Sequence, residues 1–207
     1  MKKLKKISSQ DLVNELIKRG NNFTTVYYDD RISSPSNYIE IPYQHILEMV
    51  SCDKEITKEF FDKNTWTLTY VLWDEKTNDA IVIDPVLDYD PASSKTSDES
   101  AMYVIEFLQL KKLKLHYILE THAHADHLTA APYLQEKLGG QLVIGNRITK
   151  VQNVFKGVFN LDDRFATDGS QFDRLLQEGE SLSFGELSLK AIFVPGHTPA
   201  CMAYEIG

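Results

Sequence analysis

Three histidines and one aspartate lie within six consecutive positions, directly after an apolar segment, and this feature constrains the fold more than any other. Residues 121–127 read THAHADH, and the preceding residues 115–120 read LHYILE, which is typical of a buried strand. The cluster is therefore expected on a loop at the end of a strand, where rigid elements hold loop side chains in place. The fold must present this loop at the edge of a β-sheet.

The spacing of the polar residues predicts a metal site. His122 and His124 are two residues apart, so in extended backbone their side chains share a face and can reach one ion. Asp126 and His127 follow where the chain turns into a helix and can point to a second position. His197, in a Pro-Gly-His-Thr-Pro segment after a predicted strand, can complete the first position. Imidazole and carboxylate are the usual ligands of zinc and non-heme iron, so these five residues indicate a metalloenzyme, with Asp126 also a catalytic candidate.

The remaining histidines and cysteines lack such a context. His45 and His116 are predicted to lie on the surface or to pack. Cys201 is predicted to pack in a sheet, and Cys52 has no recognisable active-site loop around it. The two cysteines are far apart and form no CxxC motif, which favours a reducing compartment such as the cytoplasm or an organelle matrix.

Composition excludes two classes of partner. The 207-residue chain has a formal net charge of −8, so the phosphate backbone of a nucleic acid would be repelled. No segment approaches the roughly 18 consecutive apolar residues that a membrane-spanning helix needs. Hydrophobic residues make up 43% of the chain, which is enough to form one domain with a core. We therefore expect neither a nucleic acid nor a membrane as a partner.

The pattern along the chain divides it into an N-terminal extension, residues 1–56, and a main domain, residues 57–207. A helix ending near Lys18, a strand over 23–28 and a short helix over 46–50 are predicted in the extension. In the main domain helices are predicted from a Ser97 cap to Lys112 and from Thr129 to Gly139, with a loop over 84–100. Strands are predicted over 66–73, 80–84, 115–120, 141–144, 182–184, 187–194 and 202–206. Such an order predicts an α/β fold of mixed sheets covered by helices.

The HxHxDH string and the later Pro-Gly-His-Thr segment resemble the metallo-β-lactamase fold superfamily. Further segments resemble its persulfide dioxygenase (sulfur dioxygenase) branch, which includes the bacterial β-lactamase-like hydrolase proteins. These segments are IDPV at 83–86, DPA at 90–92, ETHAHADH at 120–127, GSQFD at 169–173 and PGHTPAC at 195–201. The resemblance implies a four-layer αββα sandwich over about residues 57–207.

The resemblance also implies a cofactor and a reaction. The branch holds one iron(II), with His122 and His197 as two of its ligands, and oxidises a persulfide such as glutathione persulfide with dioxygen to sulfite and a thiol. His124, Asp126 and His127 would then orient ligands and substrate. The alternative is a thioester hydrolase of the glyoxalase II type, with one or two zinc ions and with Asp126 and His127 as ligands of the second zinc.

The resemblance implies a third iron ligand as well, an aspartate in a Gly-Asp segment shortly after the strand at 202–206. The sequence ends at Gly207, so we expect a sandwich truncated at the C-terminus, with exposed core surface that favours association with another copy. A third hypothesis follows, a non-catalytic remnant. The extension weakly resembles the start of a rhodanese-like domain.

Overall fold

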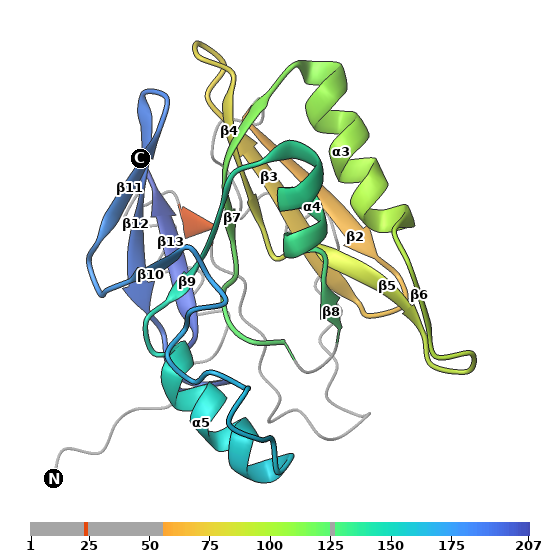
Figure 1. The fold of residues 1–207 in the computed structure, drawn as a ribbon. Coiled ribbons are helices and arrows are strands. Elements are labelled where there is room, and N and C mark those ends of the chain that lie inside the picture. Colours follow the sequence, from red (N-terminus) through yellow and green to blue (C-terminus); the bar gives the residue numbers. More distant parts are fainter. Residues whose placement is uncertain (1–22, 25–55, 125–126) are drawn as a thin grey trace, which may run out of the picture.

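The polypeptide forms two β-sheets that pack face to face, with helices on the outer side of one of them (Figure 1). The computed structural model describes residues 23–24, 56–124 and 127–207. The larger sheet has the order β10-β9-β7-β4-β3-β2 and is formed by β2 (Thr57–Asp62), β3 (Thr67–Trp73), β4 (Asp79–Ile83), β7 (Lys114–Leu119), β9 (Gln141–Gly145) and β10 (Arg174–Leu176). The smaller sheet has the order β1-β13-β12-β11 and is formed by β1 (Phe23–Thr24), β11 (Ser181–Phe184), β12 (Leu187–Phe193) and β13 (Met202–Ile206).

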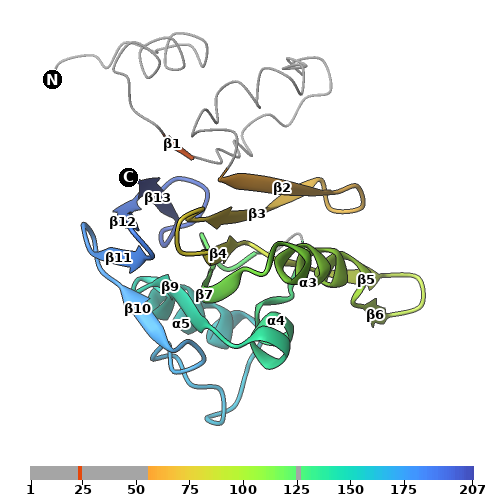
Figure 2. The ribbon, with the colours of Figure 1, turned by 90° about the horizontal axis from the view of Figure 1, so that it is seen from above.

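The central strands of the larger sheet are apolar along most of their length because both of their faces are buried. One face packs on the smaller sheet, through Leu72, Ile81, Leu119 and Val143. The other face packs on helices α3 (Glu99–Lys111) and α4 (Ala131–Leu138), through Val71, Val82, Ile118 and Leu142. Figure 2 shows these helices and the smaller sheet on opposite faces of the larger one. The predicted mixed sheets with helices outside are confirmed.

The core between the two sheets should dominate stability. Leu189 of β12 is fully buried there. We expect Leu189→Ala to lower the free energy of unfolding by about 2–5 kcal/mol, because it leaves a cavity that the two sheets cannot close. Leu110 on α3 is 84% exposed and is the matched control, for which a change within about 0.5 kcal/mol is expected. Urea denaturation of both variants measures the difference, and equal losses would contradict this placement of the core.

Four strands of the larger sheet run parallel and carry the site at one edge. β4 pairs with β7, β7 with β9, and β9 with β10, all in parallel. The carboxyl ends of parallel strands meet at the same edge of a sheet, so the residues that follow β4 and β7 become neighbours. The segment predicted from 115–120 as a strand is β7, and the histidine-rich run leaves directly from its end.

Three predictions in the main domain are wrong. The helix predicted from Thr129 begins at Ala131, because Thr129 belongs to the short strand β8. The sequence predicts a loop over 84–100, but the structure has a hairpin of β5 (Val86–Asp90) and β6 (Lys95–Ser97), and β5 also pairs with β8 (Leu128–Thr129). β6 and β8 are exposed and β5 buries only Val86, so these short strands lack the apolar alternation that identifies a strand. Ser97 belongs to β6 and cannot cap α3, whose N-cap is Asp98.

One helix has no counterpart in the sequence predictions. Helix α5 (Ile148–Val158) buries Ile148, Val151 and Gln152, while Val154 and Val158, which follow Val151 at helical spacing, are exposed. Its apolar residues recur at helical spacing, so the sequence carried this signal although no helix was predicted there; the second usual signal is absent, because no side chain caps the first turn.

The predicted elements of the extension, together with His45 and Cys52, lie outside the described residues, apart from residues 23–24. These two residues form β1, which pairs antiparallel with β13. Among the helices of the described residues, none has both the length and the apolar character that crossing a membrane requires.

Candidate metal centre

Two acidic residues stand at the edge of the larger sheet where β4 and β7 end. Asp84 follows β4 and Glu120 follows β7. The backbone N–H of Asp84 donates to the carbonyl of Leu119 at 2.9 Å, and that of Glu120 donates to the carbonyl of Val143 at 2.9 Å. The sheet ladder thus continues one residue past the strands and sets the two acids side by side. Both are buried.

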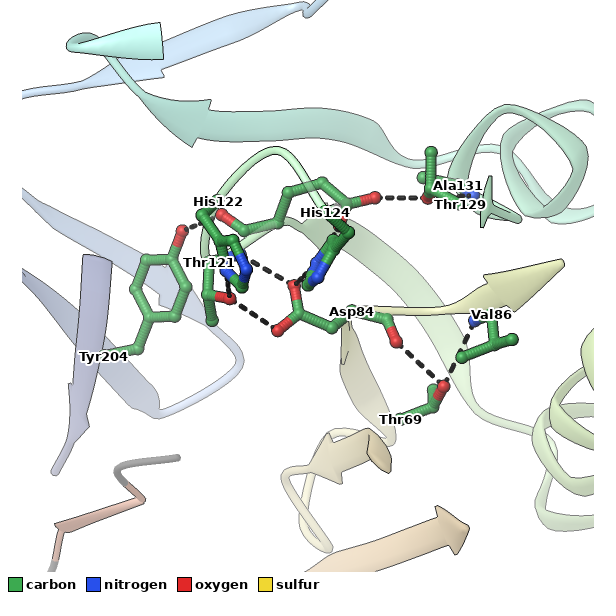
Figure 3. A network of polar contacts seen from close by, with 10 residues as sticks. Thr69, Asp84, Val86, Thr121, His122, His124, Thr129, Ala131 and Tyr204 are labelled. Carbon is green, nitrogen blue, oxygen red and sulfur yellow. Dashed lines mark hydrogen bonds and ion pairs between the residues drawn. The ribbon is translucent and has the colours of Figure 1, made fainter. Parts of the chain in front are cut away.

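The backbone at Asp84 is held in an unusual conformation. Its φ of 49° lies in the left-handed region, which aspartate and asparagine tolerate better than most residues. The hydroxyl of Thr69 donates to the carbonyl of Asp84 at 2.9 Å and accepts from the N–H of Val86 at 3.3 Å (Figure 3). This clamp turns the carboxylate of Asp84 toward the histidine-rich loop.

The Asp84 carboxylate fixes the first residues of that loop. It accepts the backbone N–H of Thr121 at 2.7 Å and the Thr121 hydroxyl at 2.6 Å. The same hydroxyl lies 2.8 Å from Nδ1 of His122. Because a hydroxyl has one hydrogen, and Thr121 gives it to Asp84, Nδ1 of His122 must be the donor in the second contact. A metal ligated by His122 would therefore be bound through Nε2.

His124 is held between the two acids. Its Nε2 lies 3.1 Å from Oδ1 of Asp84 and 3.3 Å from Oε2 of Glu120. The other carboxylate oxygen of Glu120 accepts from the Thr129 hydroxyl, and its backbone carbonyl accepts from the buried Tyr204 hydroxyl at 2.9 Å. A metal ligated by His124 would therefore be bound through Nδ1.

Burial and mutual charge set the protonation of this group. Burial lowers the pKa of His124, but hydrogen bonds and charge from Asp84 and Glu120 outweigh it and raise that pKa to about 10. Burial, aided by the negative charge of Asp84, raises the pKa of Glu120 to about 7 in spite of His124. Burial also acts to raise the pKa of Asp84, but His124 and Thr121 hold it below its usual range. Asp84 is therefore the stronger acid of the pair.

Four predicted site residues come together at this edge. The ring of His122 lies 4.1 Å from that of His124 and 4.9 Å from that of His197, between centroids. The ring of His127 lies 4.1 Å from that of His124. The fifth predicted residue, Asp126, lies outside the described residues. Segments that are distant in the sequence thus supply one cluster of imidazoles.

The loop that carries His197 is tied to the cluster on both sides. The backbone N–H of Met202 donates to the carbonyl of Thr121 at 2.8 Å, so β13 begins beside His122. Cys201 is buried, as predicted, and its sulfur lies 3.2 Å from the N–H of Thr198 and 3.1 Å from the Thr198 hydroxyl. These contacts close the turn around His197.

His116 lies apart from the cluster and has its own partner. It is on β7 near the strand's beginning, and its Nε2 is 2.5 Å from Oδ1 of Asp79, the first residue of β4. The two residues therefore pair at the opposite end of the same strands. The predicted surface or packing role of His116 agrees with this position.

The donors present at this edge fit a metal ion. The imidazoles of His122, His124 and His197 are ligands that zinc and iron(II) share. One atom each of Asp84, Glu120 and His124 also lie within 4.8 Å of one another, so the acids and Nε2 of His124 form an alternative group of ligands. The two sets use opposite nitrogens of His124. In the first set the acids would orient the histidines, which is a common arrangement at metal sites.

Sequence reasoning assigned no role to several residues that build this site: Asp84, Glu120, Thr121 and Tyr204. One signal was available for the acids, since each directly follows an apolar strand and parallel strands present their carboxyl ends together. No signal pointed to Tyr204, whose hydroxyl reaches Glu120 from the other sheet.

Comparisons with known proteins identify the class of protein that this fold and site define. Residues 67–207 match the family model of the Metallo-beta-lactamase superfamily. The chain belongs to this superfamily, and the predicted relationship and mixed α/β fold are confirmed.

Individual relatives include both hydrolases and a dioxygenase. A probable metallo-hydrolase of Burkholderia pseudomallei is 49% identical over 147 residues, which cover 71% of this chain and 50% of that protein. The mitochondrial persulfide dioxygenase ETHE1 of Bos taurus is 30% identical over 151 residues, which cover 73% and 48%. The crystal structure of ETHE1 from Myxococcus xanthus matches with a TM-score of 0.56 at 26% identity, covering 73% of this chain and 54% of that one. The chain spans about half the length of the curated relatives it matches.

Proposed function

We propose that the protein is an iron-dependent persulfide dioxygenase that acts on glutathione persulfide or a similar persulfide. The observation that carries the proposal is the gathering of His122 and His197, from distant segments, with Asp84 orienting the ring of His122 through Thr121. The similarity to ETHE1 in sequence and in fold supports a persulfide as the substrate.

In this proposal the residues of the chain divide into ligands and groups that position them. His122 and His197 would hold the ion. Asp84 would fix His122 through the Thr121 hydroxyl, and it would fix His124 directly. His124, with Asp126 and His127, would orient ligands and substrate. Iron(II), when bound, would supply the dioxygen chemistry, which amino-acid side chains do not provide.

The proposed reaction conserves atoms and charge. The sulfur–sulfur bond of the persulfide breaks, the outer sulfur is oxidised to sulfite, and dioxygen is reduced. With one water consumed, the products are the thiol, sulfite and two protons. The protein has to place the persulfide sulfur beside the metal position and keep the imidazoles in the correct tautomer, which the contacts of Thr121 and Asp84 are suited to do.

A second candidate is a zinc-dependent thioester hydrolase of the glyoxalase II type. The metallo-hydrolase of Burkholderia pseudomallei, at 49% identity, favours it. His127, whose ring lies beside that of His124, would then serve with Asp126 as a ligand of a second zinc. Zinc, when bound, would supply Lewis-acid chemistry for hydrolysis. The third candidate, a non-catalytic remnant, predicts neither activity.

Parallel assays of iron-loaded and zinc-loaded protein separate the three candidates. The proposal predicts oxygen consumption and sulfite release with glutathione persulfide, only in the iron form. The hydrolase alternative predicts cleavage of a glutathione thioester by the zinc form and no oxygen uptake. An absence of oxygen uptake in a fully iron-loaded sample would refute the dioxygenase. An absence of both activities would favour the third candidate, a non-catalytic remnant.

A further inference from the structure

Arg147 is a half-buried cation without an acidic partner among the described residues. It lies between β9 and α5, and its guanidinium carbon is 3.9 Å from the ring centroid of Phe193. The described residues include two more arginines, Arg164 and Arg174, and each donates to a nearby carboxylate at 2.6 Å. Arg147 makes neither a hydrogen bond nor an ion pair of this kind within the described part of the chain.

The stacking on Phe193 has a structural basis. A Cβ built on Gly145 would lie 2.6 Å from the Met202 side chain and 3.3 Å from that of Phe193, so only glycine lets these side chains approach the end of β9. Phe193 and Met202 are register partners in β12 and β13. The guanidinium of Arg147, two residues after Gly145, is thereby held over a well-packed aromatic ring.

The same contacts connect the surroundings of Arg147 with the candidate metal centre. Met202, the partner of Phe193, donates its backbone N–H to the carbonyl of Thr121, the residue before His122. Phe193 also precedes His197 by four positions at the end of β12. Arg147 also follows β9, the parallel neighbour of β7, so it lies at the same edge of the larger sheet as the histidine-rich loop.

A guanidinium that lies over an aromatic ring still has N–H donors to offer, because the ring carries no hydrogen-bonding oxygen or nitrogen. Stacking uses the π-face, whereas the N–H groups point outward in the plane, in the fork that matches a carboxylate. Within the described part of the chain, Glu178 contacts Phe193: its Oε2 accepts the Phe193 backbone N–H at 2.5 Å, and no ion pair joins it to Arg147. In a chain of net charge −8, a cation without a partner at this position points to an anionic ligand.

We propose that Arg147 binds a carboxylate of the thiol substrate and makes the site selective for anionic thiols and persulfides. The proposal rests on the proposed function for the nature of the substrate, because it takes glutathione as the scaffold. In this proposal Arg147 determines substrate specificity. The residue would fix the position of the carboxylate and thereby direct the sulfur of the substrate toward the imidazoles.

Calorimetric titration of the metal-loaded protein with two probes tests this assignment. The probes are glutathione and its diethyl ester, in which the carboxylates are masked. Arg147→Gln should weaken glutathione binding by about 10–100-fold, the loss expected for one charge-assisted hydrogen-bonded pair. It should leave ester binding unchanged. Arg147→Lys should recover part of the loss, since it keeps the charge without the fork.

Two control variants make the result specific. Arg164→Gln removes an exposed arginine that pairs locally with Asp162, and should not change glutathione affinity. Glu178→Gln tests whether Arg147 instead forms an ion pair with the neighbouring Glu178. Glutathione affinity should stay within about twofold, because the Glu178 carboxylate already accepts a backbone N–H. Thermal unfolding of each variant confirms that it is folded.

The outcomes separate this inference from the proposed function. Three results would overturn the carboxylate contact. Arg147→Gln could lose equal affinity for glutathione and for its ester, or it could lose no affinity for glutathione. The unaltered protein could also fail to bind glutathione. If binding depends on Arg147 but iron-loaded protein consumes no oxygen with glutathione persulfide, the contact stands and the dioxygenase fails. If oxygen is consumed with a KM that Arg147→Gln does not change, the dioxygenase stands and the contact fails.

Discussion

Replacing His122 by alanine is expected to lower metal affinity by more than about 100-fold and to remove any metal-dependent activity. Loss of a group that only orients a ligand already costs about 10–100-fold in affinity or activity, so loss of a ligand should cost at least the upper end of that range. His122 lies at the centre of the cluster, with the rings of His124 and His197 at 4.1 and 4.9 Å. Titration against a competing chelator measures the change.

His116→Ala is the matched control for this experiment. It removes an imidazole from the same strand, but at the other end, where the ring pairs with Asp79. This variant should bind metal as the unaltered protein does. A similar loss of affinity in both variants would indicate a general effect on folding, and an unchanged affinity in His122→Ala would contradict the proposed centre.

Replacing Asp84 by alanine is expected to destabilise the fold by about 3–5 kcal/mol, the cost of breaking a buried ion pair from one side. The substitution removes the acceptor for the backbone and hydroxyl of Thr121 and one acidic partner of His124. It also places alanine at a φ of 49°, where a Cβ without a polar group is strained. Urea denaturation measures the loss.

Asp84→Asn separates the charge from the shape at this position. Asparagine tolerates the left-handed backbone and can still accept the Thr121 N–H, so the stability loss should be smaller than with alanine. Metal affinity should nevertheless fall by about 10–100-fold, because the carboxylate that orients His124 becomes a neutral amide. Unchanged metal affinity in Asp84→Asn would show that the acid has no part in the centre.

The sequence predicts the apolar elements and the histidine cluster well, for a shared physical reason. Buried strands such as β3, β4 and β7 carry their apolar pattern in consecutive residues, so local reading finds them. The motif residues are dense enough to be recognised without knowledge of distant contacts. His197 is the exception, since its proximity to His122 follows from the two sheets packing together.

The residues that the sequence did not reveal act through contacts between distant segments. Asp84 and Thr121 are 37 positions apart, and Tyr204 reaches Glu120 across 84 positions. Nothing in the local pattern distinguishes these side chains from ordinary strand-end or sheet residues. The polar hairpin over 84–100 was missed for a related reason, since its pairing with β8 is also non-local.

X-ray absorption at the iron K-edge of the iron-loaded protein tests the central claim most directly. The claim is that His122, with His197, holds the ion while Asp84 and Glu120 stay outside it. It predicts scattering from imidazole rings that diminishes in both His122→Ala and His197→Ala. A spectrum dominated by oxygen ligands and unchanged in these variants would place the ion with Asp84, Glu120 and Nε2 of His124 instead, and would contradict the account.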